Sequence, residues 1–500
     1  FGAIDNGTSG IRTNTFTAET SFVPEAQDAA ALGNTSLKNV QLESFQYCFL
    51  PVEMRMPLKF GSESVSHVNC LRVSAEVVDS RGQQATGWGE TPLSVTWAWP
   101  SGTLSYETRY EVMVAFCKHA AQSFVEVNES GHPMEIGYVF LAEHLPSVLE
   151  AFNKSYSIEP MPYLAALIVV SAFDIAIHDA YGNLHQIDIY DTYNSKYMTH
   201  DLSYYFHSSP EADQFQGLFP ADFLEEQPSV KVPVWHLVGG LDPLEESDKK
   251  ESDPKDGYPI TLIEWIKSDG LRCLKIKLKG TDSQWDYQRI VKVGSIARST
   301  GVDALSVDFN CTVKTPEYVN KILDRLKKEQ TQISDLILYV EQPFPYDIES
   351  NQIDVSSLSA RKPLFLDESA HDWKFVELGR QLGWTGVALK TCKTQTGALL
   401  SLCWAKSHNM PLMVQDLTNP MLAQIPHVRL AAHAGTVRGV ESNGMQFYPA
   451  ASEPEQRIHP GIYKRRNGQL DLSTLSGTGF GYRLSEIERQ LPSFAKITKK

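Results

Sequence analysis

Five short apolar segments in the second half of the chain each run into a charged residue, and this pattern constrains the fold more than any other feature. The charges follow the order Lys, Asp, Glu, Asp, Lys, and successive charges lie 23 to 33 residues apart. Each segment is rich in branched or aromatic residues and is followed by turn formers or a helical pattern, so each predicts a buried strand. The segments are 274–278, 304–308, 337–341, 363–367 and 386–390.

This spacing predicts a (β/α)8 barrel. A strand and its returning helix need about this much chain, because a parallel crossover takes a dozen or more residues. In such a barrel the chemistry lies at the carboxyl ends of the strands, which is where the five charges would converge. We therefore expect an α/β protein with a barrel over residues 230–450. The remaining strands are expected at 231–240, 411–415 and 439–447.

The first half of the chain predicts an α+β capping domain. A strand at 70–78, a turn and a return strand from 85 are followed by helices near 106–124 and 162–183. We expect the cap to span 41–229, with an irregular insertion near 186–229, an N-terminal extension at 1–40 and a C-terminal segment at 451–500 that returns to the cap. Two stretches, 56–65 and 91–99, are expected to be loops that select the substrate. Trp97 and Trp99 in the second could close over a ligand, although packing in a core is the alternative for each.

The three carboxylates among the strand-end charges indicate a metal site. Asp308, Glu341 and Asp367 would repel one another on adjacent strands unless a cation joined them. Their hard oxygen atoms suit Mg²⁺, with Mn²⁺ as the alternative. Buried salt bridges without catalysis are the competing interpretation.

The two terminal lysines, Lys277 and Lys390, would lie four strands apart in a ring of eight, on opposite sides of the mouth. That arrangement suits removal of a proton next to a carboxylate. The cation would stabilise the ene-diolate, one lysine would take the proton and the other would return one. We expect Lys275 and the cation to lower the pKa of the lysine that acts as base.

With these motifs the chain resembles the enolase superfamily, in the mandelate racemase and muconate lactonizing enzyme family, and within it the lysine-lysine subgroup. The resemblance covers roughly residues 41–490. It implies that Asp308, Glu341 and Asp367 bind the metal, that Lys277 and Lys390 are the acid/base pair, and that Lys275 and Asn310 support them. The motifs are Lys275-x-Lys277, Asp308-Phe309-Asn310, Glu341-Gln342-Pro343, Asp367-Glu368-Ser369 and Leu389-Lys390-Thr391.

The chain departs from the family pattern at two places that affect specificity. Dipeptide epimerases carry Asp-x-Asp on the eighth strand to hold an ammonium group, where this chain has Glu441-Ser442-Asn443. Glu441 is therefore expected to contact a cation in substrate binding, but a dipeptide substrate is in doubt. The paired glycines that usually follow the sixth-strand lysine are replaced by Gln395-Thr396, so the backbone there is expected to approach the ligand differently.

The function expected from this resemblance is that of a metal-dependent racemase or epimerase acting on a small carboxylate. A lactonizing cycloisomerase or a dehydratase would share its first half-reaction, and a non-catalytic metal-stabilised barrel or a Schiff-base aldolase are further alternatives. His178 beside Asp179 raises a catalytic dyad, but neighbours in a helix point about 100° apart, so we expect a structural role. The substrate, its stereochemistry and the oligomeric state are left open, although family members are often symmetric homo-oligomers.

Composition narrows the range of partners and compartments. The formal net charge of −15 disfavours nucleic acid and anionic membranes. No apolar run approaches the length of a membrane span, and residues 1–40 lack the features of a signal peptide. The seven cysteines are odd in number, widely spaced and without a CxxC pair, which indicates free thiols in a reducing compartment. A cytoplasmic protein is expected.

Overall fold

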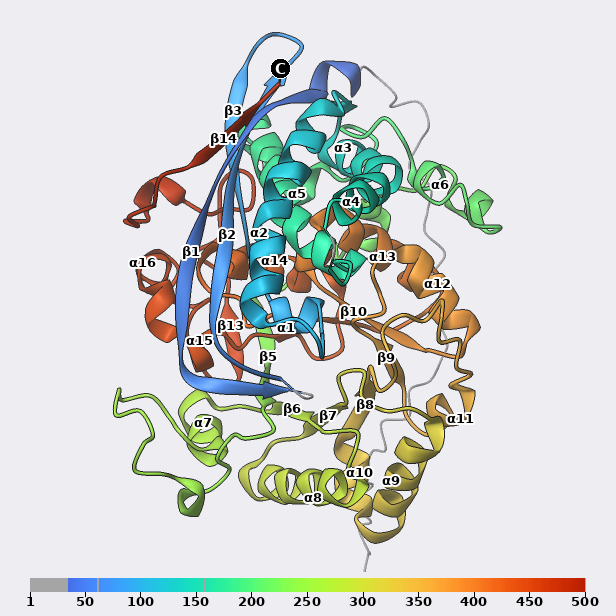
Figure 1. Cartoon of the computed structure of the whole chain (residues 1–500), viewed down its shortest axis with the longest axis vertical. Helices are drawn as coiled ribbons and strands as arrows, with labels where there is room; N and C mark the ends of the chain where they lie inside the picture. Colours follow the sequence, from blue (N-terminus) through green and yellow to red (C-terminus); the bar gives the residue numbers. More distant parts are fainter. Residues whose placement is uncertain (1–34, 61–62, 157, 500) are drawn as a thin grey trace, which may run out of the picture.

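The computed structural model describes residues 35–60, 63–156 and 158–499. The chain forms a closed barrel of eight parallel strands and a cap built on an antiparallel sheet (Figure 1). The predicted fold, a (β/α)8 barrel with an α+β cap, is confirmed. The predicted extension at 1–40 lies mostly outside the described residues.

The eight barrel strands pair in chain order, and the last closes on the first. They are β5 (Lys231–Val238), β6 (Cys273–Lys277), β7 (Ala304–Asp308), β8 (Ile337–Glu341), β9 (Leu364–Leu366), β10 (Gly386–Leu389), β11 (Leu412–Val414) and β12 (Val440–Glu441). A further strand, β13 (Gln469–Asp471), adds antiparallel to β5. The eighth strand is shorter than predicted, because the chain turns after Glu441 and enters a helical turn at Gly444.

Helices follow most of the barrel strands and cover the outside of the barrel. They are α7 (Leu262–Asp269), α8 (Ser283–Thr300), α9 (Pro316–Glu329), α10 (Thr331–Leu336), α11 (Ser356–Ser359), α12 (Trp373–Gln381), α13 (Gln395–Ser407), α14 (Gln424–Ala434), α15 (Gly444–Phe447) and α16 (Glu453–Ile458). Short helical turns lie at η7 (Glu246–Asp248), η8 (Thr391–Lys393), η9 (Met421–Ala423), η10 (Pro449–Ser452) and η11 (Leu484–Glu486).

The register of the strands places charges at one end of the barrel and apolar groups below them. Lys277 is opposite Asp308, and Asp308 is opposite Glu341. Side chains two residues apart on a strand share a face, so Cys273 lies beneath Lys275 and Lys277 on β6. Cys273 belongs to a buried cluster inside the barrel that includes Trp235, Tyr339 and Phe365. A dry, packed interior therefore supports the charged mouth.

The cap sheet has the strand order β14-β1-β2-β3. Its strands are β1 (Val40–Phe60), β2 (Glu63–Asp79), β3 (Gln84–Pro92) and β14 (Ala495–Thr498), and β4 (Ser130–Gly131) pairs with β1. The helices and helical turns of the cap and the insertion are η2 (Thr35–Lys38), α1 (Val95–Ala98), α2 (Tyr106–Glu126), α3 (Pro133–Val139), η3 (Phe140–His144), α4 (Leu145–Lys154), α5 (Tyr163–His185), η4 (Ile189–Thr192), α6 (Leu202–Tyr205), η5 (Ala212–Phe215) and η6 (Pro220–Phe223).

The stretch 56–65, predicted as a loop, belongs instead to a long two-stranded arm. β1 continues to Phe60 and β2 begins at Glu63, so the two strands reach from the cap to the barrel (Figure 1). The arm is ordered this way because Leu50, Val52 and Leu58 are buried against barrel residues such as Leu237. The barrel thus supplies the apolar partner that fixes the strands.

The central cap helix is α5, which packs on the sheet at two glycines. A Cβ atom at Gly87 would lie 1.9 Å from Ala180 N, and one at Gly89 would lie 2.1 Å from Ala172 O, so only glycine permits this close approach. Within the described residues α5 is the one helix long and apolar enough to span a membrane, but 94% of its apolar window is buried inside the protein. It is a core helix.

Candidate active site

The mouth of the barrel gathers all five strand-end charges, and the β6 side is the more densely charged. Lys275 Nζ lies 2.5 Å from Glu341 Oε1, 2.8 Å from Glu441 Oε2 and 3.4 Å from Asp308 Oδ2. Lys277 Nζ lies 2.5 Å from Asp308 Oδ2. All of these side chains are buried. The ammonium of Lys275 therefore stands among three carboxylates that belong to three different strands.

The β10 side of the mouth holds Lys390, on the opposite side of the ring from β6. Its Nζ lies 3.2 Å from Asp367 Oδ2, donates to the Asp416 carbonyl at 3.3 Å, and lies 5.2 Å from the centre of the Trp97 ring. A second buried lysine, Lys393, donates to the Asp367 carbonyl and lies 5.8 Å from the same ring. The cap thus contributes an aromatic face to this side.

Mutual repulsion and burial set the ionisation of these groups. Burial raises the pKa of Glu341, and the negative charge of Asp308 adds to the effect against the opposing pull of Lys275. Burial opposes ionisation of Asp308 too, but Lys277 and Lys275 together hold its pKa below the ordinary value. Burial, with Asp367 and Asp308 nearby, raises the pKa of Glu368 to about 7.

The pKa of Lys390 shifts in the direction opposite to the one expected for a base lysine. Burial disfavours its charge, but the carboxylates of Asp367 and Glu441 outweigh burial and raise the pKa above the ordinary value. The sequence indicates which cations lie near Lys390, but the direction of its pKa shift depends on carboxylates that lie close to its amine in the structure. Lys390 is therefore held as an ammonium in this structure.

The donor set at the mouth fits a hard divalent cation. Asp308, Glu341 and Asp367 offer only oxygen atoms, which suits Mg²⁺ or Mn²⁺. Asp367 Oδ1, Glu368 Oε2 and Asn310 Oδ1 are buried without a hydrogen-bond partner, and such groups call for a ligand or ion. Among the described residues no three carboxylate, histidine or cysteine groups already surround one point, because lysine ammonium groups stand between the carboxylates.

The two residues predicted to bind substrate have protein partners here. Asn310 Nδ2 donates to Glu368 Oε1 at 3.1 Å, and its backbone N–H donates to Asp308 Oδ1 at 2.8 Å. Glu441 accepts from Lys275 and, at 2.9 Å, from Asn443 Nδ2. The cation that Glu441 contacts is therefore Lys275.

A cleft with about 430 Å³ of open space, part of it continuous with solvent, opens onto this mouth. Lys277 and Lys390 line it, together with Trp97, Leu58 of the arm, and Asp416. Sequence reasoning missed Asp416. Gln415-Asp416 directly follows the apolar run of β11, so the rule that identified the other strand-end charges would have found it.

His178 and Asp179 do not form a dyad. His178 faces Thr396 and Tyr193. Asp179 instead accepts hydrogen bonds from the backbone N–H groups of Trp88 and Phe480. The two side chains leave α5 in different directions, as expected for helical neighbours.

Comparison with known proteins shows which family the barrel resembles in sequence. Residues 261–487 match the sequence profile of the family described as enolase C-terminal domain-like. The matched stretch contains the barrel strands β6 to β12.

Individual relatives are more distant. An L-Ala-D/L-amino acid epimerase from Pedosphaera parvula (strain Ellin514) is 32% identical over 123 residues, which is 24% of this chain and 31% of that enzyme. The match thus spans about a third of the length of this curated relative.

Solved structures share the fold at low identity. A muconate lactonizing enzyme from Pseudomonas fluorescens, complexed with muconolactone, is 14% identical with a TM-score of 0.56, covering 90% of this chain and 99% of that one. A dipeptide epimerase from Enterococcus faecalis V583, complexed with Mg and the dipeptide L-Leu-L-Tyr, is 16% identical with a TM-score of 0.55, covering 88% and 99%.

Proposed function

We propose that this protein is a Mg²⁺-dependent racemase or epimerase of the enolase superfamily, in the lysine-lysine subgroup. It moves a proton at the carbon next to a carboxylate of a small molecule. The observation that carries the proposal is the placement of Lys277 and Lys390 on opposite sides of one cleft, with Asp308, Glu341 and Asp367 between them. Two amines facing each other across a substrate can act on opposite faces of one carbon atom.

The chain's own residues have distinct parts in this reaction. Lys277 and Lys390 remove a proton from one face and deliver one to the other, so the configuration at carbon is inverted. Asp308, Glu341 and Asp367 would hold the cation. When bound, the cation would polarise the substrate carboxylate and neutralise carboxylates that otherwise keep Lys390 charged. Lys275, fixed by Glu441, adds positive charge beside the substrate carboxylate.

Epimerisation is favoured over the other reactions of this fold by the epimerase relative, which is 32% identical to this chain over 123 residues. A cycloisomerase or dehydratase would begin with the same proton removal, and a muconate lactonizing enzyme is among the structural neighbours. We also propose the division of the chain predicted above, with the cap at 41–229, the barrel at 230–450 and a C-terminal segment at 451–500.

The test is incorporation of deuterium next to the carboxylate. The protein is incubated in D₂O with Mg²⁺ and pools of dipeptides, N-acyl amino acids and sugar acids, and the products are measured by mass spectrometry. We expect exchange that a chelator abolishes and that Lys277→Ala and Lys390→Ala each reduce by about 10²- to 10⁴-fold. Exchange that survives in both variants would overturn the assignment of the lysines.

Two other outcomes select the alternative functions. Absence of exchange with every pool, together with Mg²⁺ binding detected by calorimetry, would favour a non-catalytic barrel. Covalent trapping of a carbonyl compound on a lysine by borohydride would favour a Schiff-base aldolase, which has no need of three metal-binding carboxylates.

A further inference from the structure

A buried polar network joins the cap helix α5 to the segment that follows Lys390. Asp174 on α5 accepts hydrogen bonds from both the backbone N–H (3.0 Å) and the hydroxyl (2.8 Å) of Thr396. His178, one turn further along α5, lies with Nε2 3.0 Å from the same hydroxyl oxygen. The residues Asp174, His178 and Thr396 are at most 1% exposed. Residues 218 to 222 positions apart in the chain thus meet behind the mouth.

The hydrogen bonds in this network run in one direction. Burial lowers the pKa of His178 to about 3, so its ring is neutral and carries one N–H. The Thr396 hydroxyl donates to Asp174, so it must accept from His178 Nε2–H. His178 Nδ1 is then an acceptor, and the Tyr193 hydroxyl donates to it at 3.0 Å. Each of these groups has a defined role, and such a fully satisfied network holds its members rigidly.

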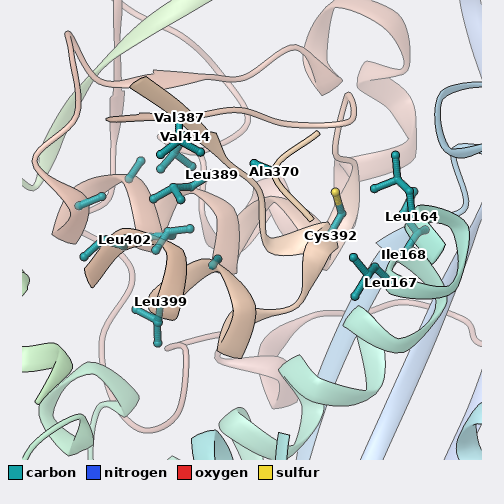
Figure 2. Close-up of a cluster of buried hydrophobic side chains, with 14 of the residues drawn as sticks. Leu164, Leu167, Ile168, Ala370, Val387, Leu389, Cys392, Leu399, Leu402 and Val414 are labelled. Atoms are coloured by element: carbon teal, nitrogen blue, oxygen red, sulfur yellow. The ribbon is translucent and has the colours of Figure 1, made fainter. Parts of the chain in front are cut away.

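The network is sealed against solvent by a close helix contact. A Cβ atom at Gly137 on α3 would lie 2.5 Å from both Asp174 Oδ1 and Thr396 Oγ1. Next to this polar network, hydrophobic residues of α5 pack against the segment that follows Lys390. Figure 2 shows Leu164, Leu167 and Ile168 of α5 beside Cys392, two residues after Lys390.

The segment held in this way contains an unfavourable backbone conformation. Thr394 has φ 75° and ψ 150°, a region that β-branched residues avoid. Such a conformation is costly and persists only where the surroundings fix it. Its hydroxyl accepts from Gly397 N–H at 2.9 Å and caps α13. Thr396 and Thr394 together therefore determine how the chain leaves Lys390.

Lys390 lies just outside a regular strand. It follows the last residue of β10, and its amine contacts Asp367 at 3.2 Å, the Asp416 carbonyl at 3.3 Å and the Trp97 ring of the cap at 5.2 Å. Lys277, by contrast, is the last residue of β6 and lies in register with Asp308. The position of Lys390 thus depends on the turn that follows it.

We propose that Asp174 and His178 of the cap helix are positioning residues for Lys390, acting through Thr396. This inference rests on the proposed two-lysine reaction. It assigns to the cap a part in the chemistry on one face of the substrate. If the network only stabilised the contact between cap and barrel, its loss would slow proton exchange equally on both faces of the substrate.

The test compares exchange on the two faces of the substrate. Thr396→Val removes the hydroxyl at constant volume, and Asp174→Asn is an independent second variant. The probes are L-Ala-L-Ala and L-Ala-D-Ala, together with any stereoisomer pair found by the exchange screen. We expect exchange with the stereoisomer whose α-hydrogen faces Lys390 to slow on the order of 10- to 100-fold, because small misplacements of a reacting group have effects of this size.

The rate of exchange on the Lys277 face and the KM values should stay constant. Exchange on the Lys277 face and the KM for both stereoisomers should change less than about twofold, and Thr396→Ser should restore the lost rate. Asp179→Asn is the matched control, because Asp179 is equally buried on α5 but binds the N–H groups of Trp88 and Phe480. It should lower the melting temperature and leave the ratio of the two rates unchanged. Equal slowing of both faces, or of neither, would overturn the proposal.

A second measurement does not require turnover. Competitive acetylation of lysine amines, measured by peptide mass spectrometry, gives the reactivity of Lys390 relative to Lys277. We expect Thr396→Val to change this ratio several-fold and Asp179→Asn to leave it constant. If wild-type protein exchanges no substrate, the proposed function fails, and an unchanged ratio would separately overturn the positioning role.

Discussion

The two sides of the barrel mouth present lysines that are held in different ways. On the β6 side, Lys275 and Lys277 belong to a regular strand, and their amines contact Asp308, Glu341 and Glu441 on three other barrel strands. On the β10 side, Lys390 lies just beyond its strand, beneath Trp97 of the cap and in front of a turn fixed by α5. The barrel alone places one amine, whereas the cap and barrel together place the other.

This difference has a consequence for how the protein could change in evolution. The β6 side has a fixed arrangement, because moving one strand would disturb several charges at once. The β10 side depends on contacts from the cap, so changes in the cap can alter one amine and leave the other in place. In a barrel with an attached cap, the lysines on β6 can therefore keep their positions while changes in the cap alter the position of the lysine after β10.

The largest expected effect is on stability and would sharpen this comparison. Lys275→Met removes the cation that stands among Glu341, Glu441 and Asp308. Breaking a buried charge network in this way costs about 3–5 kcal/mol, because carboxylates are left buried and unpaired. We expect chemical denaturation in the presence of chelator to show a loss of this size, and Mg²⁺ to recover part of it.

Lys390→Met is the matched variant on the other side. Asp367 would keep the nearby amine of Lys393, 3.6 Å from Asp367 Oδ1, so we expect a smaller loss of stability than for Lys275→Met. Equal losses in the two variants would contradict the view that the β6 side carries the denser network.

The next effect is a pH dependence that originates behind β12, the strand midway between β6 and β10 on one side of the ring. His427 on α14 is fully buried, donates from Nε2 to the Glu441 carbonyl at 2.7 Å, and has its pKa lowered to about 4 by burial. Its pKa in the unfolded chain is higher, about 6.5. The unfolded state therefore binds the proton first, so the stability due to neutral His427 is complete above pH 6.5 and is lost as pH falls toward 4.

Denaturation curves of wild type and His427→Gln between pH 7 and 4 measure this contribution. The glutamine amide can still donate to the Glu441 carbonyl but does not titrate. We expect wild type to lose up to about 3 kcal/mol more than the variant over this range, from 1.36 kcal/mol per pKa unit. Parallel curves for the two proteins would show that His427 is not held neutral.

Part of this arrangement could be predicted from the sequence and part could not. The strand ends with Lys277, Asp308 and Glu341 were found because strand patterns and spacing are local properties of the chain. The contact between Asp174 and Thr396 joins residues 222 positions apart. Thr396 was noted only as a departure from the paired glycines of the family, and nothing in the sequence links it to Asp174. The arm at 56–65 was wrongly expected to be a loop, because its apolar partner comes from the barrel.

The direction of the pKa shift at Lys390 shows the same limit at the level of charge. The sequence indicated cations around the lysines and therefore a lowered pKa. The structure adds the distances: Lys275 lowers the pKa of Lys390 as expected, but without a bound cation Asp367 at 3.2 Å and Glu441 outweigh it. Charge types could be predicted from the motifs, but their balance depends on distances between strands that no motif encodes.

A smaller effect is expected from the aromatic face on the β10 side. Trp97 lies over both Lys390 and Lys393, and it shields the Lys390 amine while favouring its ammonium form. A buried cation–π contact is worth about 0.5–2 kcal/mol. Trp97→Leu should therefore raise the acetylation rate of Lys390 by roughly 2- to 30-fold and leave that of Lys277 constant, with Trp97→Phe between. A parallel rise at Lys277 would mean that the ring only restricts access to the cleft.

The smallest effect is expected where the arm meets the barrel, at a contact that serves neither lysine directly. Arg55 on β1 binds Asp256 through Nε–Oδ2 at 2.6 Å and Nη2–Oδ1 at 2.8 Å, and the Asp256 side chain is 35% exposed. Partly exposed pairs contribute about 0.2–1 kcal/mol, so Asp256→Asn should change global stability by no more than this. It should still speed amide hydrogen exchange in the arm near Arg55, since the pair holds the arm to the segment before α7.

The control is Glu150→Gln, which breaks a fully exposed pair with Lys154 and should alter neither quantity. Faster acetylation of Lys390 in Asp256→Asn would extend the dependence on the cap to the arm, whereas unchanged acetylation of both lysines would confine it to Trp97 and α5.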